Sequence, residues 1–439
     1  MARIYLLLAA ASVALAAPGW KAGFARVSIA PSGPLWMAGY SARTAASEGV
    51  DLDVQAKALV LEDSSGRRSL LITTDMLGFT RGLAQRVAAR IAKDHGIPRE
   101  RLMLNSSHTH SGPVIERMLG AAYDATDAQW ADVDRYTEDL ENRIVNVAAR
   151  AMKSLQPVDL SFGRGTAGFA RNRRVAYHPN GPVDHGVPVL AIRDARGKLL
   201  AAVFGYACHN TTLGGEFRKF HGDYAGVAQA RLEQTHRGAT AFFITGCGAD
   251  SNPNPRGTLD HVNRYGAELA AAVDKVLAGA TRPVRGPLRA AFEEVALVFD
   301  TPPTKAEFEA RLQDKNKYVA RHARNQLDRI AREGRLPTEY PYPVQVWRFG
   351  GDLTIVALGG EVVVDYALRL GAELGADNLW VAGYSNDVPG YIPSERILQE
   401  GGYEGAGAMI YYGPPGPFAP GVEMSIVKKV HELVRLTGR

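Results

Sequence analysis

Two histidines separated by a single residue are the sequence feature that most directly suggests chemistry. His108 and His110 lie in the segment Asn105-Ser-Ser-His-Thr-His-Ser-Gly-Pro113. In an extended segment the side chains at i and i+2 project to the same side, so both imidazoles can approach one centre. Zinc binds imidazole readily, and its remaining ligands must then come from elsewhere in the chain. The pair therefore indicates part of a metal site, with two ordinary surface-loop histidines as the alternative interpretation.

Other candidate residues come directly after apolar runs or turn signals. His209 follows an apolar run, where a structural histidine is the alternative. Glu361 follows the apolar run 353–358, where the alternative is a carboxylate that favours a helix N-terminus. Tyr391 and Tyr403 lie in segments punctuated by glycine and proline, which indicate turns, and loop packing is the alternative for both. None of these residues decides the chemistry by itself.

An alternation of short β-rich runs and helical patterns must position these residues. Ser-Ser-Gly between two β-rich runs predicts a hairpin. The predicted strands are 57–62, 69–74, 101–105, 188–193, 199–207, 240–245, 344–349, 353–357 and 379–382, and the predicted helices include 82–93, 224–235 and 261–278. This alternation predicts a mixed α/β fold, a single large domain with central mixed sheets flanked by helices. The polar segments fall just past strand ends, where α/β folds commonly build their sites.

The longest predicted helix runs from Thr304 to Gly334. Thr304 and Glu307 form the Thr-x-x-Glu pattern of a capping box, and Gly334 ends the helical pattern. Basic residues between 311 and 335 are interspersed with acidic ones, which indicates the solvated face of a helix.

Composition and charge restrict the class of protein. The 439 residues are 46% hydrophobic and 22% charged, which is typical of a globular protein with a large core. The formal net charge is +5, from 51 Lys and Arg against 46 Asp and Glu. So small an excess argues against nucleic acid as the main partner and permits weak attraction to an anionic membrane surface. The sequence does not indicate the oligomeric state.

The N-terminal segment predicts export. Arg3 precedes the apolar run 4–15, and Ala14-Leu15-Ala16 matches the small-x-small pattern of a signal-peptide cleavage site. The run is too short to span a bilayer comfortably. We therefore divide the chain into a signal peptide, residues 1–16, and one domain, residues 17–439, that is secreted or periplasmic.

The two cysteines, Cys208 and Cys247, leave their own interpretations open. Export makes a disulfide between them chemically feasible. However, each cysteine lies beside a candidate site motif, so a buried thiol or a thiol close to the metal is an equal alternative.

Taken in chain order, these segments resemble the catalytic domain of the neutral ceramidase family. The resemblance spans Phe24 to Gly413, and the matches occur in the family's order. The matching segments are Ser107-His-Thr-His-Ser-Gly-Pro113, Asn172-Arg173-Arg174, His209-Asn-Thr-Thr212, Leu358-Gly-Gly-Glu361, Asn386 to Tyr391 and Tyr403 to Ala406. That family consists of zinc-dependent amidases that hydrolyse the N-acyl bond of the sphingolipid ceramide. The resemblance therefore implies a zinc hydrolase with a lipid or small-molecule amide as its substrate.

The resemblance also implies a division of roles within the site. The implied zinc ligands are His108, His209, Glu361 and Tyr391, and the residues implied around the scissile amide are His110, Arg173 and Tyr403. Such a ligand set leaves a position for water, whose pKa zinc lowers toward about 7. We expect Arg173, Tyr403 or His110 to stabilise the oxyanion, and His110 to protonate the departing amine.

The chain departs from the family at the serine to which a catalytic role has been assigned. The family's Gly-Asp-Val-Ser-Pro-Asn matches Gly248-Ala-Asp-Ser-Asn-Pro-Asn254, which puts Asn252 in the place of the serine and Ser251 one residue early. A one-residue offset in a turn points a side chain elsewhere, so Ser251 is a poor substitute. Water activated by zinc tolerates this change, whereas a serine nucleophile does not. We expect Asn252 to hold the substrate or the oxyanion.

The leading hypothesis is an exported zinc-dependent hydrolase that cleaves a linear N-acyl amide bond. It does not specify ceramide, because we expect no counterpart of the family's C-terminal immunoglobulin-like domain. A zinc-dependent esterase or lactonase is one alternative, since esters are attacked more easily than amides. A non-catalytic exported binding protein on the same fold, which has lost the serine, is the other.

Overall fold

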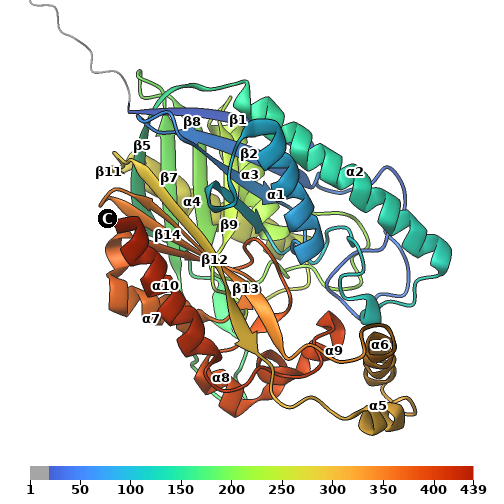
Figure 1. Cartoon of the computed structure of the whole chain (residues 1–439). Helices are drawn as coiled ribbons and strands as arrows, with labels where there is room; N and C mark the ends of the chain where they lie inside the picture. Colours follow the sequence, from blue (N-terminus) through green and yellow to red (C-terminus); the bar gives the residue numbers. More distant parts are fainter. Residues whose placement is uncertain (1–18, 439) are drawn as a thin grey trace, which may run out of the picture.

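The computed structural model describes residues 19–438 as a mixed α/β domain (Figure 1). The predicted signal peptide, residues 1–16, lies outside the described residues. The larger sheet has nine strands in the order β4-β3-β2-β1-β5-β7-β8-β9, with β11 paired to β5. Its members are β1 (Trp20–Ser28), β2 (Gln55–Glu62), β3 (Arg68–Thr74), β4 (Leu102–Ser106), β5 (Gln156–Thr166), β7 (Gly186–Arg193), β8 (Leu199–Tyr206), β9 (Thr240–Thr245) and β11 (Arg282–Pro283). The β2–β3 pair is the predicted hairpin.

A second sheet has four strands in the order β12-β13-β14-β16. These are β12 (Leu288–Val298), β13 (Glu339–Phe349), β14 (Leu353–Leu358) and β16 (Leu379–Ala382). Both sheets are mixed, because the pairs β3–β4, β8–β9 and β14–β16 are parallel and the remaining pairs are antiparallel.

The two sheets pack face to face, and each strand therefore divides its side chains between two cores. In β14, Ile355 and Ala357 point into the layer between the sheets, while Val356 and Leu358 point into the core beneath the helices. Both faces of the strand are buried, so it reads as an uninterrupted apolar run instead of an alternating one. The apolar runs that the sequence shows are thus strands covered on both sides.

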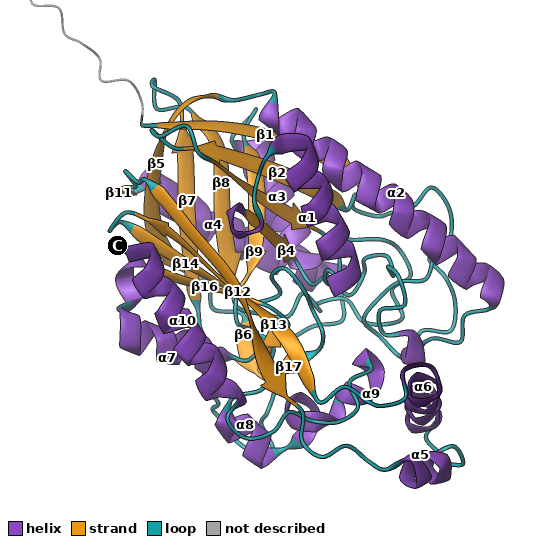
Figure 2. Cartoon of the chain, viewed as in Figure 1, coloured by secondary structure: helices purple, strands orange, loops and turns teal. Residues whose placement is uncertain are grey.

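Helices cover the outer faces of this sandwich (Figure 2). The helix α2 packs on β1 and β2; α3 packs on β9, α4 on β5 and β7, and α10 on β12 and β13. The helices are α1 (Arg81–His95), α2 (Asp127–Met152), α3 (Asp223–Thr235), α4 (Leu259–Ala278), α5 (Lys305–Arg311), α6 (Lys317–Glu333), α7 (Val364–Leu374), α8 (Glu395–Glu400), α9 (Met409–Tyr412) and α10 (Val422–Gly438), with short 3-10 turns at Arg99–Arg101, Gly120–Ala122 and Ala376–Asn378. Among the described residues, none of these helices is long and apolar enough to cross a membrane.

Two short two-stranded ribbons lie at the edge where the strands end and the candidate residues follow. The strand β6 (Ala170–Asn172) pairs with β10 (Ser251–Pro253), and β15 (Glu361–Val362) pairs with β17 (Tyr391–Ile392). In the second ribbon Glu361 lies directly opposite Tyr391. Two residues that are far apart in the sequence are therefore neighbours through backbone pairing alone.

The prediction of one helix from Thr304 to Gly334 is wrong in its interior. The Thr304 capping box with Glu307 is present, and Gly334 ends α6 in the left-handed conformation at φ 76°. The chain breaks between α5 and α6 because Asn316 caps a second helix, its side chain accepting a hydrogen bond from the Tyr318 backbone N–H. A side chain that satisfies a free backbone donor starts a helix where the apolar pattern alone predicts continuity.

The side chain of Asn105 joins the two sheets at the end of β4. Its Nδ2 donates to Gly383 O at 2.8 Å and to Ser385 Oγ at 3.0 Å, and its Oδ1 accepts from Thr245 N at 3.0 Å. The residue is fully buried. It lies just before the His108 segment, so it fixes the strand end from which the candidate metal loop departs.

Replacement of Asn105 by Ala is expected to lower the free energy of unfolding by about 2–5 kcal/mol, because it leaves buried backbone groups of Thr245 and Gly383 without partners. Chemical denaturation monitored by circular dichroism measures the change. Asn325→Ala, at an exposed position on α6, is the matched control and should shift stability by less than about 0.5 kcal/mol. Equal effects of the two substitutions would contradict the bridging role.

Candidate metal centre and its pocket

Loops at the ends of three strands bring the candidate ligands together. His108 follows β4, His209 follows β8, and Glu361 follows β14. The two histidine loops are joined by a parallel bridge between Thr109 and Asn210. The convergence at strand ends that the sequence predicts is therefore confirmed by the topology.

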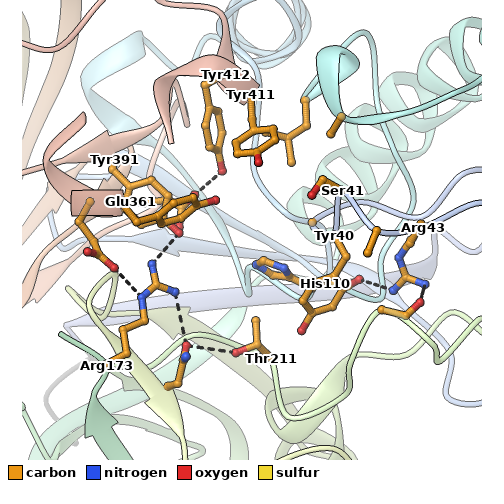
Figure 3. Close-up of a pocket in the computed structure, with 18 of the residues that line it drawn as sticks. Tyr40, Ser41, Arg43, His110, Arg173, Thr211, Glu361, Tyr391, Tyr411 and Tyr412 are labelled. Atoms are coloured by element: carbon orange, nitrogen blue, oxygen red, sulfur yellow. Dashed lines mark hydrogen bonds and ion pairs between the residues drawn. The ribbon is translucent and has the colours of Figure 1, made fainter. Parts of the chain in front are cut away.

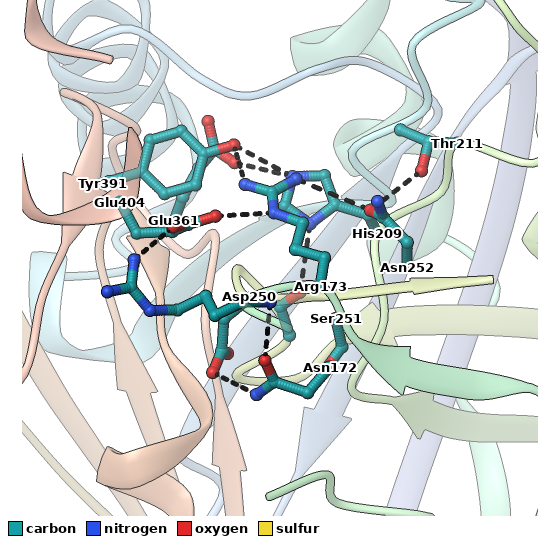
Figure 4. A network of polar contacts seen from close by, with 12 residues as sticks. Asn172, Arg173, His209, Thr211, Asp250, Ser251, Asn252, Glu361, Tyr391 and Glu404 are labelled. Carbon is teal, nitrogen blue, oxygen red and sulfur yellow. Dashed lines mark hydrogen bonds and ion pairs between the residues drawn. The ribbon is translucent and has the colours of Figure 1, made fainter. Parts of the chain in front are cut away.

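The predicted ligands form one buried cluster. His108 Nε2 lies 3.2 Å from Glu361 Oε2, and His209 Nε2 lies 2.9 Å from the same oxygen. Tyr391 OH lies 3.1 Å from His209 Nε2, and His110 Nε2 lies 3.1 Å from His108 Nε2. The three imidazoles each offer a nitrogen within 4.8 Å of the others, as the ligands of a single metal ion do. Figures 3 and 4 show Glu361 and Tyr391 side by side in this cluster.

Backbone carbonyls set the tautomers of two of these histidines. His108 Nδ1 lies 2.6 Å from Leu77 O, and His209 Nδ1 lies 3.0 Å from Gly248 O. A carbonyl only accepts, so Nδ1 carries the proton and Nε2 of each neutral ring presents a lone pair. Burial lowers the pKa of His209 to about 4, so this ring is neutral at pH 7.

The lone pairs of His108 Nε2 and His209 Nε2 consequently face Glu361 Oε2, and no hydrogen-bond donor from residues 19–438 lies between them. This oxygen is buried and receives no hydrogen bond from any described residue, although two imidazole Nε2 atoms lie within 3.2 Å. Lone pairs in contact repel unless a cation lies among them. Two imidazoles, a carboxylate and a phenol are a donor set that suits zinc, and the carbonyls behind the imidazoles orient the rings as they do in metal sites. The residues present therefore fit a metal ion.

His110 lies in the same cluster but also borders open space. Its Nδ1 is buried and has no partner among residues 19–438, and its ring packs against Tyr40 with centroids 4.9 Å apart. Gly39 has φ +94°, and a Cβ there would collide with the His110 ring. The position of this ring thus depends on a glycine. The position suits either an additional metal ligand or, as the sequence predicts, a group that faces the substrate.

Arg173 connects the cluster to the pocket. Its Nε donates to Glu404 Oε1 at 2.7 Å and its Nη2 to Tyr391 OH at 3.0 Å, while Nη1 lies 3.5 Å from Asn252 Oδ1 (Figure 4). Glu404 and Tyr391 hold two sides of the guanidinium. The Nη1 edge is the one that remains available to a ligand.

The structure separates the two candidate substitutes for the family's serine. Asn252 lines the pocket, and its Oδ1 lies 3.4 Å from Thr211 Oγ1. Ser251 is fully buried, does not line the pocket, and uses its backbone carbonyl to accept from His209 N at 2.9 Å. The expectation that Ser251 points elsewhere agrees with this arrangement.

Two tyrosines complete the wall nearest the cluster. Tyr403 lies in a π-helical turn (Tyr403–Gly407), is 47% exposed, and packs against Tyr391 with ring centroids 5.3 Å apart. Tyr412, which sequence reasoning missed, donates a hydrogen bond to Glu361 Oε1. No motif surrounds Tyr412 in the sequence, and only its contact with Glu361 identifies it.

Backbone strain is concentrated at this site. His108, Tyr384 and Asn386 have φ values of 58°, 52° and 66°, in the left-handed region that side chains other than glycine rarely adopt. The Tyr384 ring packs on the His108 ring with centroids 4.4 Å apart. Such conformations persist where surrounding contacts enforce them, and they cluster at functional sites.

The cysteines take no part in the site. Both are free and buried, and neither lines the pocket. Burial raises the pKa of the Cys208 and Cys247 thiols well above the usual value, so neither is a nucleophile at neutral pH. Of the interpretations that the sequence left open, a buried thiol is the one that holds.

A pocket of about 990 Å³ opens over the cluster (Figure 3). His110, Arg173, Glu361 and Tyr391 border it at the cluster, and the loop from Gly39 to Ala45 forms part of the opposite wall. A pocket of this size accommodates a small-molecule ligand.

Known sequences resemble part of this chain. A sequence profile described as neutral/alkaline non-lysosomal ceramidase, N-terminal, matches residues 23–295. The neutral ceramidase of Pseudomonas aeruginosa is 28% identical over 221 residues, which is 47% of this chain and 32% of that protein. Neutral ceramidase B of Dictyostelium discoideum is 27% identical over 231 residues, 48% of this chain and 32% of that protein. The matches thus cover about a third of each relative's length.

The fold is shared over nearly the whole chain. The crystal structure of the P. aeruginosa neutral ceramidase superposes with a TM-score of 0.75 at 20% sequence identity, covering 95% of this chain and 74% of that one. The profile match includes His108 and His209 but ends before Glu361 and Tyr391. The second half of the candidate metal centre therefore rests on the geometry of this chain.

The geometry predicts that the purified protein binds about one Zn²⁺ per chain, and that His209→Ala and Glu361→Gln reduce the bound metal to well below one equivalent. Elemental analysis after dialysis measures the content. The control is His236→Ala, which removes a partly exposed histidine paired with Asp274. Loss of metal in the control as well, or its retention in both site variants, would refute the assignment.

Proposed function

The chain belongs to the neutral/alkaline non-lysosomal ceramidase family, and from this premise we propose that it is an exported, zinc-dependent amidase that hydrolyses an N-acyl bond with water as the nucleophile. The observation that carries the proposal is the contact of two imidazole Nε2 atoms with the donor-free oxygen of Glu361. The family supports a hydrolase of amide bonds, and the cluster supports a metal-assisted one.

The proposed zinc ligands are His108, His209, Glu361 and Tyr391. A zinc ion bound there supplies a Lewis acid and lowers the pKa of water toward about 7. The chain's own contribution is to orient these ligands. Leu77 O and Gly248 O hold the two imidazoles, and Tyr412 holds the second oxygen of Glu361.

Arg173, Tyr403 and His110 are the proposed catalytic residues. The Nη1 edge of Arg173 is a fixed, positively charged donor beside the pocket, suited to an amide carbonyl oxygen as negative charge develops on it. The Tyr403 hydroxyl is a second donor on the same wall. The unpartnered Nδ1 of His110 suits transfer of a proton to the departing amine.

Asn252 supports water rather than a side chain as the nucleophile. Its carboxamide stands in the pocket where the family's serine is expected, and an amide is not a nucleophile. Its Nδ2 and Oδ1 can orient a polar substrate group beside Arg173. We propose this positioning role for Asn252.

The proposed location and organisation follow from the sequence. The apolar run after Arg3 supports a signal peptide over residues 1–16, and residues 17–439 form one hydrolase domain that acts outside the cytoplasm, in the periplasm or beyond the cell. The proposed substrate is a small-molecule or lipid amide, and the modest positive charge supports at most weak peripheral contact with a membrane.

Hydrolysis of an N-acyl amide is expected to need the metal. Treatment with a chelator should abolish release of the free amine, and added Zn²⁺ should restore it, because the proposed nucleophile forms only with the ion bound. Amine release measured by a fluorogenic assay, with an ester of the same acid alongside, checks the claim. An enzyme that cleaves only the ester is an esterase, and one that cleaves neither is not the proposed amidase.

His110→Ala should separate the two roles that its position permits. If His110 transfers a proton, the variant keeps about one zinc per chain while kcat falls by about 100-fold or more. Metal content and kcat are measured on the same preparation. Loss of zinc together with activity would instead make His110 a metal ligand and remove it from the proposed catalytic set.

A further inference from the structure

The walls of the pocket offer little aliphatic surface. Among the described residues that line it, Leu119 is the only aliphatic side chain larger than alanine; the others are mainly tyrosines, charged residues and small residues. A long saturated chain binds where it leaves water for apolar surface. The walls therefore offer a long saturated chain few aliphatic contacts, and their apolar surface comes mainly from tyrosine rings.

A more apolar cavity of about 580 Å³ lies next to the pocket. Leu119 and Tyr412 line both spaces. The Tyr412 hydroxyl is hydrogen-bonded to Glu361, which holds this side chain between the two spaces.

The charges around the pocket are not balanced. Five arginines and three glutamates line it. Arg173 is paired with Glu404, Arg174 with Glu404 and Glu400, and Arg218 with Glu48. These pairs neutralise most of the positive charge on the wall. The two arginines that remain are Arg43 and Arg256.

Arg43 is a buried cation that forms no ion pair with any described carboxylate. It is 4% exposed, and its guanidinium donates to three backbone carbonyls, Gly215 O at 3.0 Å, Phe217 O at 2.7 Å and His110 O at 2.9 Å. Carbonyl dipoles satisfy its hydrogen bonds without cancelling its charge. A buried charge of this kind makes the adjacent space favourable for an anion.

Arg256 is the free cation of the wall. It is exposed to the pocket, and its side chain makes no hydrogen bond, ion pair or ring contact with any residue in 19–438. Glu216 is a carboxylate that lines the pocket and has no ion pair with any residue in 19–438, and it lies against the backbone of Gly214. Arg256 lines the same pocket as Asn252, which lies next to Arg173. A guanidinium with all its donors unused is suited to bind a carboxylate.

We propose that the substrate is an N-acyl amino acid, whose free carboxylate is bound by Arg256 in the positive field of Arg43. This inference rests on the proposed amidase function. In such a molecule the carboxylate is attached to the carbon next to the amide nitrogen, so it lies close to the scissile bond. Hydrolysis breaks the C–N bond, adds the hydroxyl of one water to the acyl carbon and a proton to the nitrogen, and releases a carboxylic acid and an amino acid.

Two amides that differ only in the carboxylate test the proposal: N-acetyl-L-phenylalanine and N-(2-phenylethyl)acetamide. The zinc-loaded wild type should favour the acid by about tenfold or more in kcat/KM, as expected for a charge-assisted contact. Arg256→Gln should reduce this preference about tenfold, through KM more than kcat. Glu216→Gln should increase it, since it removes a like charge. Arg218→Gln, which alters an arginine already paired with Glu48, is the matched control and should keep the wild-type ratio.

An Arg256→Gln variant with the wild-type preference would overturn the proposal, as would preferential hydrolysis of N-(2-phenylethyl)acetamide or of N-octanoylsphingosine. In those cases the proposed amidase function would stand with a different substrate. If the zinc-loaded protein cleaves no amide of the three, the proposed function itself is wrong and this inference falls with it. Arg256 is exposed, so its replacement is not expected to disturb folding.

Discussion

The burial of one carboxylate oxygen against two imidazole lone pairs is the constraint on which the candidate site depends. Glu361 Oε2 lies within 3.2 Å of His108 Nε2 and His209 Nε2 and has no hydrogen-bond donor among the described residues. The tautomers are held from behind by backbone carbonyls, so neither ring can turn its proton toward the carboxylate. Only a cation stabilises this arrangement well. The fit of this cluster to a metal ion therefore depends on the backbone as much as on the ligands.

The fold itself brings Glu361 and the two histidines into contact. Strands from both sheets end at the same edge, and the β15–β17 ribbon sets Glu361 directly opposite Tyr391. Asn105 bridges the sheets just before the histidine loop. Left-handed backbone at His108 and Tyr384 adds local strain, which the packed sandwich offsets. The large buried core thus holds the site in a geometry that isolated loops would not keep.

Membership of the family bears on the reaction, whereas the walls of the pocket bear on the choice of substrate. The family places the chain among hydrolases, and the amide hydrolysis that we propose depends on the cluster of His108, His209, Glu361 and Tyr391. Substrate choice depends on the walls, which carry arginines and tyrosines in place of aliphatic side chains. Since the solved relative shares the fold at only 20% identity, its substrate does not transfer with the fold.

The sequence by itself determined the strands, whose buried faces require apolar runs, the capping box at Thr304, and the paired histidines, whose i, i+2 spacing places them on one side. It also identified the family. Only the tertiary structure decided that Asn252 and not Ser251 borders the pocket, that Tyr412 supports Glu361, that Cys208 and Cys247 are unpaired, and that the helix predicted at 304–334 is broken. The first group depends on local spacing and periodicity. The second depends on side-chain directions in turns and on contacts between distant segments, or, for the helix, on the additional cap at Asn316 that starts α6.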